Sequence, residues 1–287
     1  MPNNSHTPSK AGWDEAVPPR LTASGPPGDY LRTDPFLARS AVLLGMFRVY
    51  LHVLFWRRFS AVRVSRAGLP DQHGGRPLVI FTNHPSWWDP ALFMLVSPKL
   101  FPGRIGFGPM DSAQLHRYAL FRRFGAFGVE PGRRGAAQFL RVSQAGLAEG
   151  RAIMWVTAEG AFRDGRTRPV RLRPGIAHLV RHVPNAVFLP AALEYVFWNE
   201  SRPEALLRFG APVLAGGSIN EISEALTLAL TATMDGLASE AATRDAALFS
   251  TLLNGSAGTG LMYDTWQRLR AWRRGQHFDP RHETRAP

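Results

Sequence analysis

The chain has 287 residues, of which 45% are hydrophobic and 20% are charged; this composition excludes a disordered protein and is ample for one large domain or two small ones. It contains no cysteine, which excludes disulfides, thiolate catalysis and cysteine-based metal sites. The formal net charge is +12, and Lys10 and Lys99 are the only lysines. Arginine binds phosphate in two-point fashion, so the excess suits nucleic acid, anionic lipid headgroups or a phosphorylated cofactor.

Residues 1–34 are expected to form a disordered tail. This stretch is rich in proline, glycine and serine and has no hydrophobic periodicity. It also lacks the charged start and the apolar centre of a secretory signal peptide. We expect it to carry no chemistry.

Residues 35–59 are expected to form a membrane-associated helix. The run over residues 40–56 is rich in leucine, valine and phenylalanine, and it ends at a pair of arginines. A bilayer span takes about 20 apolar residues, whereas this run is shorter and contains Arg48 and His52. The pattern favours a helix that lies in the membrane interface. The alternative is a helix packed onto the folded domain.

Residues 60–215 alternate apolar strands with helices, which predicts an α/β domain with a mixed sheet flanked by helices. In such sheets functional groups gather where strands end and helices begin. In chain order we expect strand, turn and strand over residues 63–83, a helix over 89–98, a strand over 103–108, a helix over 112–124, a strand over 125–129, a helix over 134–149, a strand over 152–157, a helix over 174–182, and strands over 186–195 and 206–209.

Residues 216–287 are expected to form a helical C-terminal extension. The run over residues 219–247 is rich in alanine, leucine and glutamate, which favour helices. After a loop over residues 254–260, a basic amphipathic helix is expected over residues 261–274.

The stretch around His84 is expected to carry the chemistry. An apolar run over residues 78–82 ends in Asn83 and His84, and Asp89 stands just before a helical run. This pattern predicts a buried strand that delivers a histidine to a helix start, with Asp89 at or near the N-cap. An aspartate in the same turn can hold one imidazole nitrogen and leave the other free to accept a proton.

Four motifs in this chain resemble those of the glycerolipid (1-acylglycerol-3-phosphate) acyltransferase family. They are Asn-His-x4-Asp over residues 83–89, Phe-Gly-Val-Glu over 127–130, Thr-Ala-Glu-Gly-Ala-Phe-Arg over 157–163 and an apolar strand with a central proline over 187–193. They occur in the family's order and span about residues 78–195. The chain resembles a divergent bacterial member of that family.

The resemblance implies an O-acyltransferase that moves a fatty acyl group from acyl-coenzyme A or acyl-carrier protein to a hydroxyl of a lysophospholipid-like acceptor. His84 would be the general base and Asp89 would orient it and stabilise the imidazolium, without a protein nucleophile. Backbone N–H groups of the turn after His84 would hold the oxyanion. No metal and no cofactor beyond the acyl donor are expected. The expected partners are membrane lipids and the acyl donor, not nucleic acid, and the expected location is the cytoplasmic face of the inner membrane.

The second and third motifs depart from the family pattern at positions that bind the acceptor phosphate. Pro131 stands where the family has an arginine, and Phe162 stands where the third motif has another, with Arg163 one position later. Either the displaced arginines reach a phosphate or the acceptor is a different lipid. The residues expected to bind substrate are Asn83, Glu159, Gly160, Arg163, Arg133 and Arg134.

Several alternatives stay open. The basic loop over residues 163–173 would bind phosphates, an acidic carrier protein or lipid headgroups, or it is only a solvated surface. His178 and His182 stand four apart on an expected helix, but no third metal ligand is evident. The whole protein could be a non-catalytic lipid-binding or scaffolding member of the same fold. Charge alone suggests nucleic-acid binding, and the scattered arginines argue against it.

Overall fold

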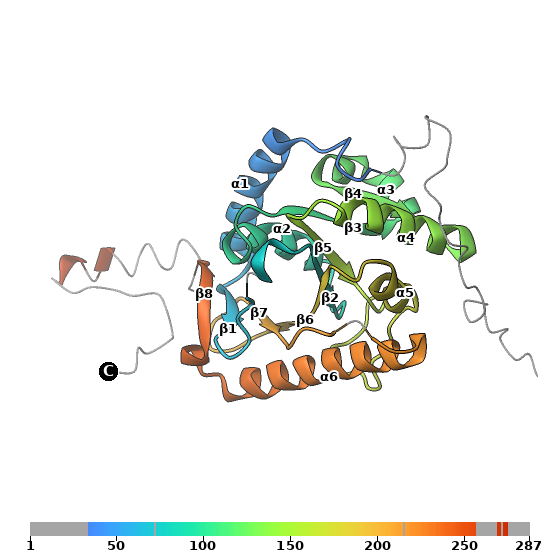
Figure 1. Cartoon of the computed structure of the whole chain (residues 1–287). Coiled ribbons are helices and arrows are strands. Elements are labelled where there is room, and N and C mark those ends of the chain that lie inside the picture. Colours follow the sequence, from blue (N-terminus) through green and yellow to red (C-terminus); the bar gives the residue numbers. More distant parts are fainter. Residues whose placement is uncertain (1–33, 72, 215, 257–268, 271, 275–287) are drawn as a thin grey trace, which may run out of the picture.

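The computed structural model describes residues 34–71, 73–214, 216–256, 269–270 and 272–274, and its centre is an eight-stranded mixed sheet with helices on both faces (Figure 1). This confirms the α/β fold class that the sequence predicts. The strands are β1 (Ala61–Ser65), β2 (Leu78–Thr82), β3 (Ile105–Asp111), β4 (Ala126–Val129), β5 (Ala152–Thr157), β6 (Val187–Val196), β7 (Glu204–Phe209) and β8 (Phe249–Asn254). The helices are α1 (Ala41–Arg58), α2 (Asp89–Leu100), α3 (Ser112–Arg117), α4 (Gly132–Leu147), α5 (Gly175–His182) and α6 (Ile219–Thr243), with short 3-10 turns η2 (His73–Gly75), η3 (Ala119–Phe124) and η4 (Ala246–Leu248).

The strand order is β4-β3-β5-β2-β6-β7-β1-β8. The first five of these strands are parallel, whereas β7 is antiparallel to β6, β1 is parallel to β7, and β8 is antiparallel to β1. The carboxyl ends of β4, β3, β5, β2 and β6 therefore meet at one edge of the sheet. Such an edge is where open α/β sheets place their functional groups.

Strand β2 lies inside the sheet, between β5 and β6, and all five of its residues are buried. A strand covered on both faces has no polar side to show, which is why its sequence is a continuous apolar run. Helices α4, α5 and α6 cover one face of the sheet, and α1 and α2 cover the other. In Figure 1 the long α6 runs along the lower side of the molecule and α1 stands at the upper left.

The order of the expected elements is confirmed from residue 41 to residue 243, with three differences in structure. The helix expected over residues 112–124 breaks at Tyr118 into α3 and η3, and Phe124 at the end of η3 stacks on Phe47 of α1 with ring centroids 4.6 Å apart. Helix α2 continues past Pro98. Strand β8 was not expected: the C-terminal extension is not only helical, since residues 249–254 pair with β1 and extend the sheet.

Two expected segments lie mostly outside the described residues. The disordered tail predicted over residues 1–34 is described only at Asp34, and the basic helix predicted over residues 261–274 only at its end. Neither prediction is tested.

Helix α1 occupies most of the segment for which we expected a membrane-associated helix. Its first turn is capped by the Ser40 hydroxyl, which accepts a hydrogen bond from the N–H of Leu43. No helix in the described part of the chain is both long and apolar enough to cross a membrane. The placement of α1 in a membrane interface finds no support in the fold itself and stays a prediction.

One face of α1 packs on the sheet and the opposite face is apolar and exposed. The buried side chains are Leu44, Leu51 and Phe55. The exposed positions recur three or four residues apart, so they form a single stripe along the helix. The stripe consists of Val42, Met46, Val49, Tyr50, Val53 and Trp56, whose exposed fractions run from 44% to 74%.

A buried ion pair joins three strands at the far side of the sheet. The Arg63 guanidinium on β1 donates through Nε to Glu204 Oε2 on β7 at 2.5 Å, and through Nη1 to Thr251 Oγ1 on β8 at 2.9 Å. Both charged side chains are almost fully buried. Removing one member of a buried pair leaves the other charge poorly compensated. The free energy of unfolding then falls far more than it does when an exposed pair is broken.

We therefore expect Arg63→Met to lower the free energy of unfolding by about 3–5 kcal/mol, measured by urea denaturation followed by circular dichroism. Arg166→Met is the matched control, because it breaks an exposed pair with Asp164 and should leave the midpoint unchanged. The double variant Arg63→Met/Glu204→Leu should recover part of the loss. Equal midpoints for Arg63→Met and Arg166→Met would contradict the assignment.

Candidate active site

His84 lies at the carboxyl edge of the sheet, in the turn between β2 and α2. The apolar strand ends at Thr82, and α2 begins at Asp89 with Pro90 in its first turn. Proline suits that position because its missing N–H has no partner there. The N-cap residue is Trp88, so Asp89 is the first residue of the helix rather than its cap. The turn therefore brings histidine and aspartate together as the sequence predicts.

The Asp89 carboxylate is fully buried and holds the His84 ring. His84 Nδ1 lies 2.6 Å from Asp89 Oδ2, and the same oxygen accepts a hydrogen bond from the N–H of Ser86 at 3.2 Å. A carboxylate beside Nδ1 favours the tautomer with its proton on that nitrogen. The other nitrogen, Nε2, is then a free proton acceptor.

Tyr195 completes the arrangement, and sequence reasoning missed it. Its hydroxyl donates to Asp89 Oδ1 at 2.7 Å. Burial raises the pKa of Tyr195 well above its usual value, and the neighbouring Asp89 charge adds to the effect, so the phenol keeps the proton that it donates. The residue belongs to β6, which pairs Ala191 with Thr82 and then runs on past the end of β2. Only that register places it at the site, and an aromatic residue near a strand end looks like core in the sequence.

Asn83 fastens the turn to β6. Its Oδ1 accepts from the N–H of Leu193 at 2.9 Å and its Nδ2 donates to the Leu193 carbonyl at 3.0 Å. The side chain is buried, and it continues the pairing of β2 with β6 beyond the last residue of β2. The structure thus gives Asn83 a positioning role, and its expected contact with substrate stays a prediction.

Glu159 and Gly160 follow β5 and lie against the His84 turn. The N–H of His84 donates to Glu159 Oε2 at 3.2 Å, and the N–H of Arg163 donates to the His84 carbonyl at 3.0 Å. Burial raises the pKa of Glu159, although the hydrogen bond from His84 and the positive charge of Arg163 act in the opposite direction. Gly160 has φ of +66° and the side chain of Arg173 fills the space of a Cβ, so glycine is needed there.

Phe162 covers the imidazole. Its ring centroid lies 4.3 Å from that of His84 with the planes tilted by 35°, and the phenylalanine is 60% exposed. Trp87, in the turn after His84, is also largely exposed. The exposed Phe162 ring therefore forms an apolar surface directly beside the imidazole. The sequence marks Phe162 only as a departure from the third motif and gives no sign of this stacking.

The arginines of the basic loop mostly face carboxylates. Arg163 Nε lies 3.8 Å from Glu159 Oε1, Arg166 binds Asp164 through two nitrogens, and Arg168 binds Asp235 of α6. The hydrogen bonds from Arg166 hold the pKa of Asp164 well below its usual range. These arginines are therefore already neutralised in part.

Arg133 and Arg134 are not brought together with His84. Both are exposed in the first turn of α4, directly after β4. Strand β4 is separated from β2 by β3 and β5, which is three strand spacings or about 14 Å. They share the edge of the sheet with the histidine but stand at its far end.

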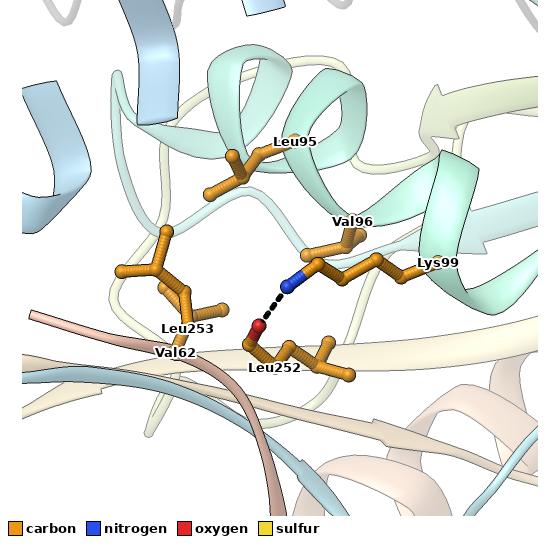
Figure 2. A pocket seen from close by; sticks show the side chains of 6 residues that line it. All are labelled: Val62, Leu95, Val96, Lys99, Leu252 and Leu253. Atoms are coloured by element: carbon orange, nitrogen blue, oxygen red, sulfur yellow. Dashed lines mark hydrogen bonds between the residues drawn. The ribbon is translucent and has the colours of Figure 1, made fainter. Parts of the chain in front are cut away.

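The remaining candidates lie elsewhere. His182 Nδ1 lies 2.7 Å from the His178 carbonyl, a contact within α5, and no group of three metal-binding side chains exists among the described residues. Figure 2 shows a small apolar pocket between α2 and β8, where Lys99 donates to the Leu252 carbonyl. Its α2 residues begin at Leu95, six positions or about 9 Å along the helix from Asp89. The pocket does not belong to the His84 site.

No protein-family model matches this chain, and no curated protein is similar to it in sequence.

Proposed function

We propose that this protein is an O-acyltransferase that moves a fatty acyl group from acyl-coenzyme A or acyl-carrier protein to a hydroxyl of a lysophospholipid-like acceptor. The observation that carries the proposal is the imidazole of His84, held at Nδ1 by a buried carboxylate that is itself bonded to Ser86 and Tyr195. A base oriented in this way is what a hydroxyl nucleophile requires, because its proton must leave as it attacks. The four ordered motifs support the same chemistry.

In the proposed reaction the acceptor oxygen attacks the thioester carbonyl while its proton passes to Nε2 of His84. The tetrahedral intermediate then collapses, the carbon–sulfur bond breaks, and the leaving thiolate takes the proton from the imidazolium. Asp89 stabilises that imidazolium, and the burial of the carboxylate makes the attraction stronger than it would be in solvent. The products are an ester and a thiol, and the base is regenerated.

The oxyanion needs hydrogen-bond donors, and the turn after His84 offers few. The N–H of Ser86 donates to Asp89, the N–H of Trp88 donates to the Ser86 hydroxyl, and the N–H of Asp89 donates to the Ser86 carbonyl. Pro85 has no N–H. Within this turn, as the structure describes it, the N–H of Trp87 is left to face the oxyanion.

We propose that Arg133 and Arg134 bind the negatively charged part of the acyl donor. Coenzyme A and an acidic carrier protein both carry negative charge at a distance from the thioester, and exposed arginines in the first turn of a helix suit such groups. Their separation from His84 along the sheet edge fits a long donor.

The base assignment predicts that His84→Gln lowers acyl transfer from oleoyl-coenzyme A to a monoacyl lipid by about 100- to 10,000-fold. Glutamine keeps a polar side chain but cannot accept the proton. The measurement is release of thiol over time. His178→Gln is the matched control and should retain activity, because that histidine lies on α5 outside the site. Undiminished transfer by His84→Gln would contradict the assignment of His84 as general base. The non-catalytic, lipid-binding alternative would then be favoured.

The positioning role of Tyr195 predicts a smaller loss. Tyr195→Phe removes one hydrogen bond to a charged carboxylate, which is worth about 1.5 kcal/mol or more, and this corresponds to roughly a tenfold lower kcat. We expect KM for the donor to stay unchanged, because the hydroxyl points at Asp89 and not at the substrate. Tyr118→Phe, which changes an exposed tyrosine between α3 and η3, should match the wild type in both kcat and KM. A lower affinity with unchanged kcat would contradict this role.

We further propose that α1 lies in the membrane interface, with its apolar stripe facing the acyl chains of the lipids. The helix contains no acidic residue and ends in Arg57 and Arg58, which suits an anionic lipid surface. Its last turns adjoin the site: the Phe55 ring lies 5.4 Å from that of Trp88, immediately before Asp89. A helix seated in the interface would thus bring lipid close to His84. Location on the cytoplasmic face of the inner membrane remains part of this proposal.

The proposal predicts that Val49→Glu/Val53→Glu abolishes most sedimentation with vesicles that contain phosphatidylglycerol. Both valines lie on the exposed stripe, so the change removes apolar contact and adds repulsive charge without touching the core. Deleting the helix is a poorer test, because Leu51 and Phe55 are buried. Leu228→Glu, equally exposed on α6, is the control and should leave binding intact. Equal sedimentation of the double variant and the control would refute the placement.

A further inference from the structure

We infer that the acceptor carries no charge beside its reacting hydroxyl, so that the preferred substrate is a neutral monoacyl lipid rather than a lysophosphatidate, and that Phe162 selects it. The inference rests on the proposed acyl transfer and changes its acceptor from a lysophospholipid-like lipid to a monoacyl lipid without a phosphate. Three observations carry it. The ring of Phe162 covers His84, the arginines of the following loop are paired with carboxylates, and Arg133 and Arg134 lie far from His84.

The space next to the base is hydrocarbon. The Phe162 ring lies 4.3 Å from the imidazole and is 60% exposed, so it offers an apolar surface beside the base. The face of an aromatic ring carries the negative end of its quadrupole. A phosphate placed there would lose water without gaining a donor, which is costly for a charged group. A glycerol backbone with its acyl chain meets no such penalty.

Two arginines of the loop that follows Glu159, Arg163 and Arg166, face carboxylates. Arg163 faces the buried Glu159, and Arg166 is bound at two points by Asp164. Glu194 on β6 adds a further acid close to Arg166, with its pKa raised mainly by burial. A phosphate near His84 would have to displace one of these carboxylates and would then lie beside it. The local charge therefore disfavours an anionic acceptor.

The exposed arginines of α4 lie too far from His84, along the carboxyl edge of the sheet, to bind a phosphate beside it. Arg133 and Arg134 follow β4, about 14 Å from β2 by strand spacing. A phosphate next to the reacting hydroxyl would sit beside His84, not at that end of the sheet. Their distance suits the donor, as proposed above, and each of the loop arginines Arg163, Arg166 and Arg168 already faces a carboxylate.

The test compares two acceptors that differ only in the phosphate. The purified full-length chain is assayed with oleoyl-coenzyme A in neutral detergent micelles, with either 1-oleoylglycerol or 1-oleoylglycerol 3-phosphate. We expect kcat/KM to be at least tenfold higher for the neutral lipid. Phe162→Arg should reduce or reverse that ratio by tenfold or more, because it places a cation where the ring stood. Phe162→Leu keeps the site apolar and should retain the preference.

Leu228→Arg is the matched control, since it adds the same charge at an equally exposed position on α6 and should leave the ratio unchanged. A wild-type preference for the phosphate-bearing lipid, or a ratio that Phe162→Arg does not move, would overturn the inference and leave acyl transfer standing. Transfer to neither acceptor would overturn the proposed function and the inference with it. Should Phe162→Arg fail to fold, the wild-type ratio and Phe162→Leu decide the matter.

Discussion

The arrangement of this site depends on one buried carboxylate. Asp89 has no contact with solvent, and a buried charge costs several kcal/mol unless it is paired and hydrogen-bonded. Its oxygens form hydrogen bonds with the imidazole of His84, the N–H of Ser86 and the hydroxyl of Tyr195. The first two groups belong to the turn, and Tyr195 belongs to β6. The fold therefore has to hold two strands and a helix start in fixed register. Asn83 helps to do so, because it ties the turn to Leu193 on the same strand as Tyr195.

A run of aromatic rings connects this site to α1. Phe55 stacks on Phe59 with centroids 4.8 Å apart, and both rings meet the edge of Trp88. Trp88 is the N-cap of the helix that carries Asp89. The inner face of α1 is thus part of the support of the site, whereas its outer face is the exposed apolar stripe. In the proposed function the same helix would both support the turn that carries His84 and bring it to lipid.

The segment that follows β5 supports the His84 turn. The N–H of His84 donates to Glu159, which anchors the turn to this segment. Phe162 then takes the position over the imidazole, and Arg163 turns towards Glu159. These contacts shape the surface beside the imidazole, whereas the hydrogen bond to Asp89 fixes its orientation.

The sequence by itself determined the elements and the local part of the site. The residues of β2 are apolar on both faces because the strand is buried on both, and Asp89 lies five residues from His84, so a single turn suffices to join them. Tyr195, the stacking of Phe162 and strand β8 were decided by the tertiary structure. Each depends on which segments become neighbours: β6 beside β2, the loop after β5 over the turn, and residues 249–254 beside β1. The spacing of residues along the chain does not predict which segments become neighbours, because register between strands is fixed by packing across the whole sheet.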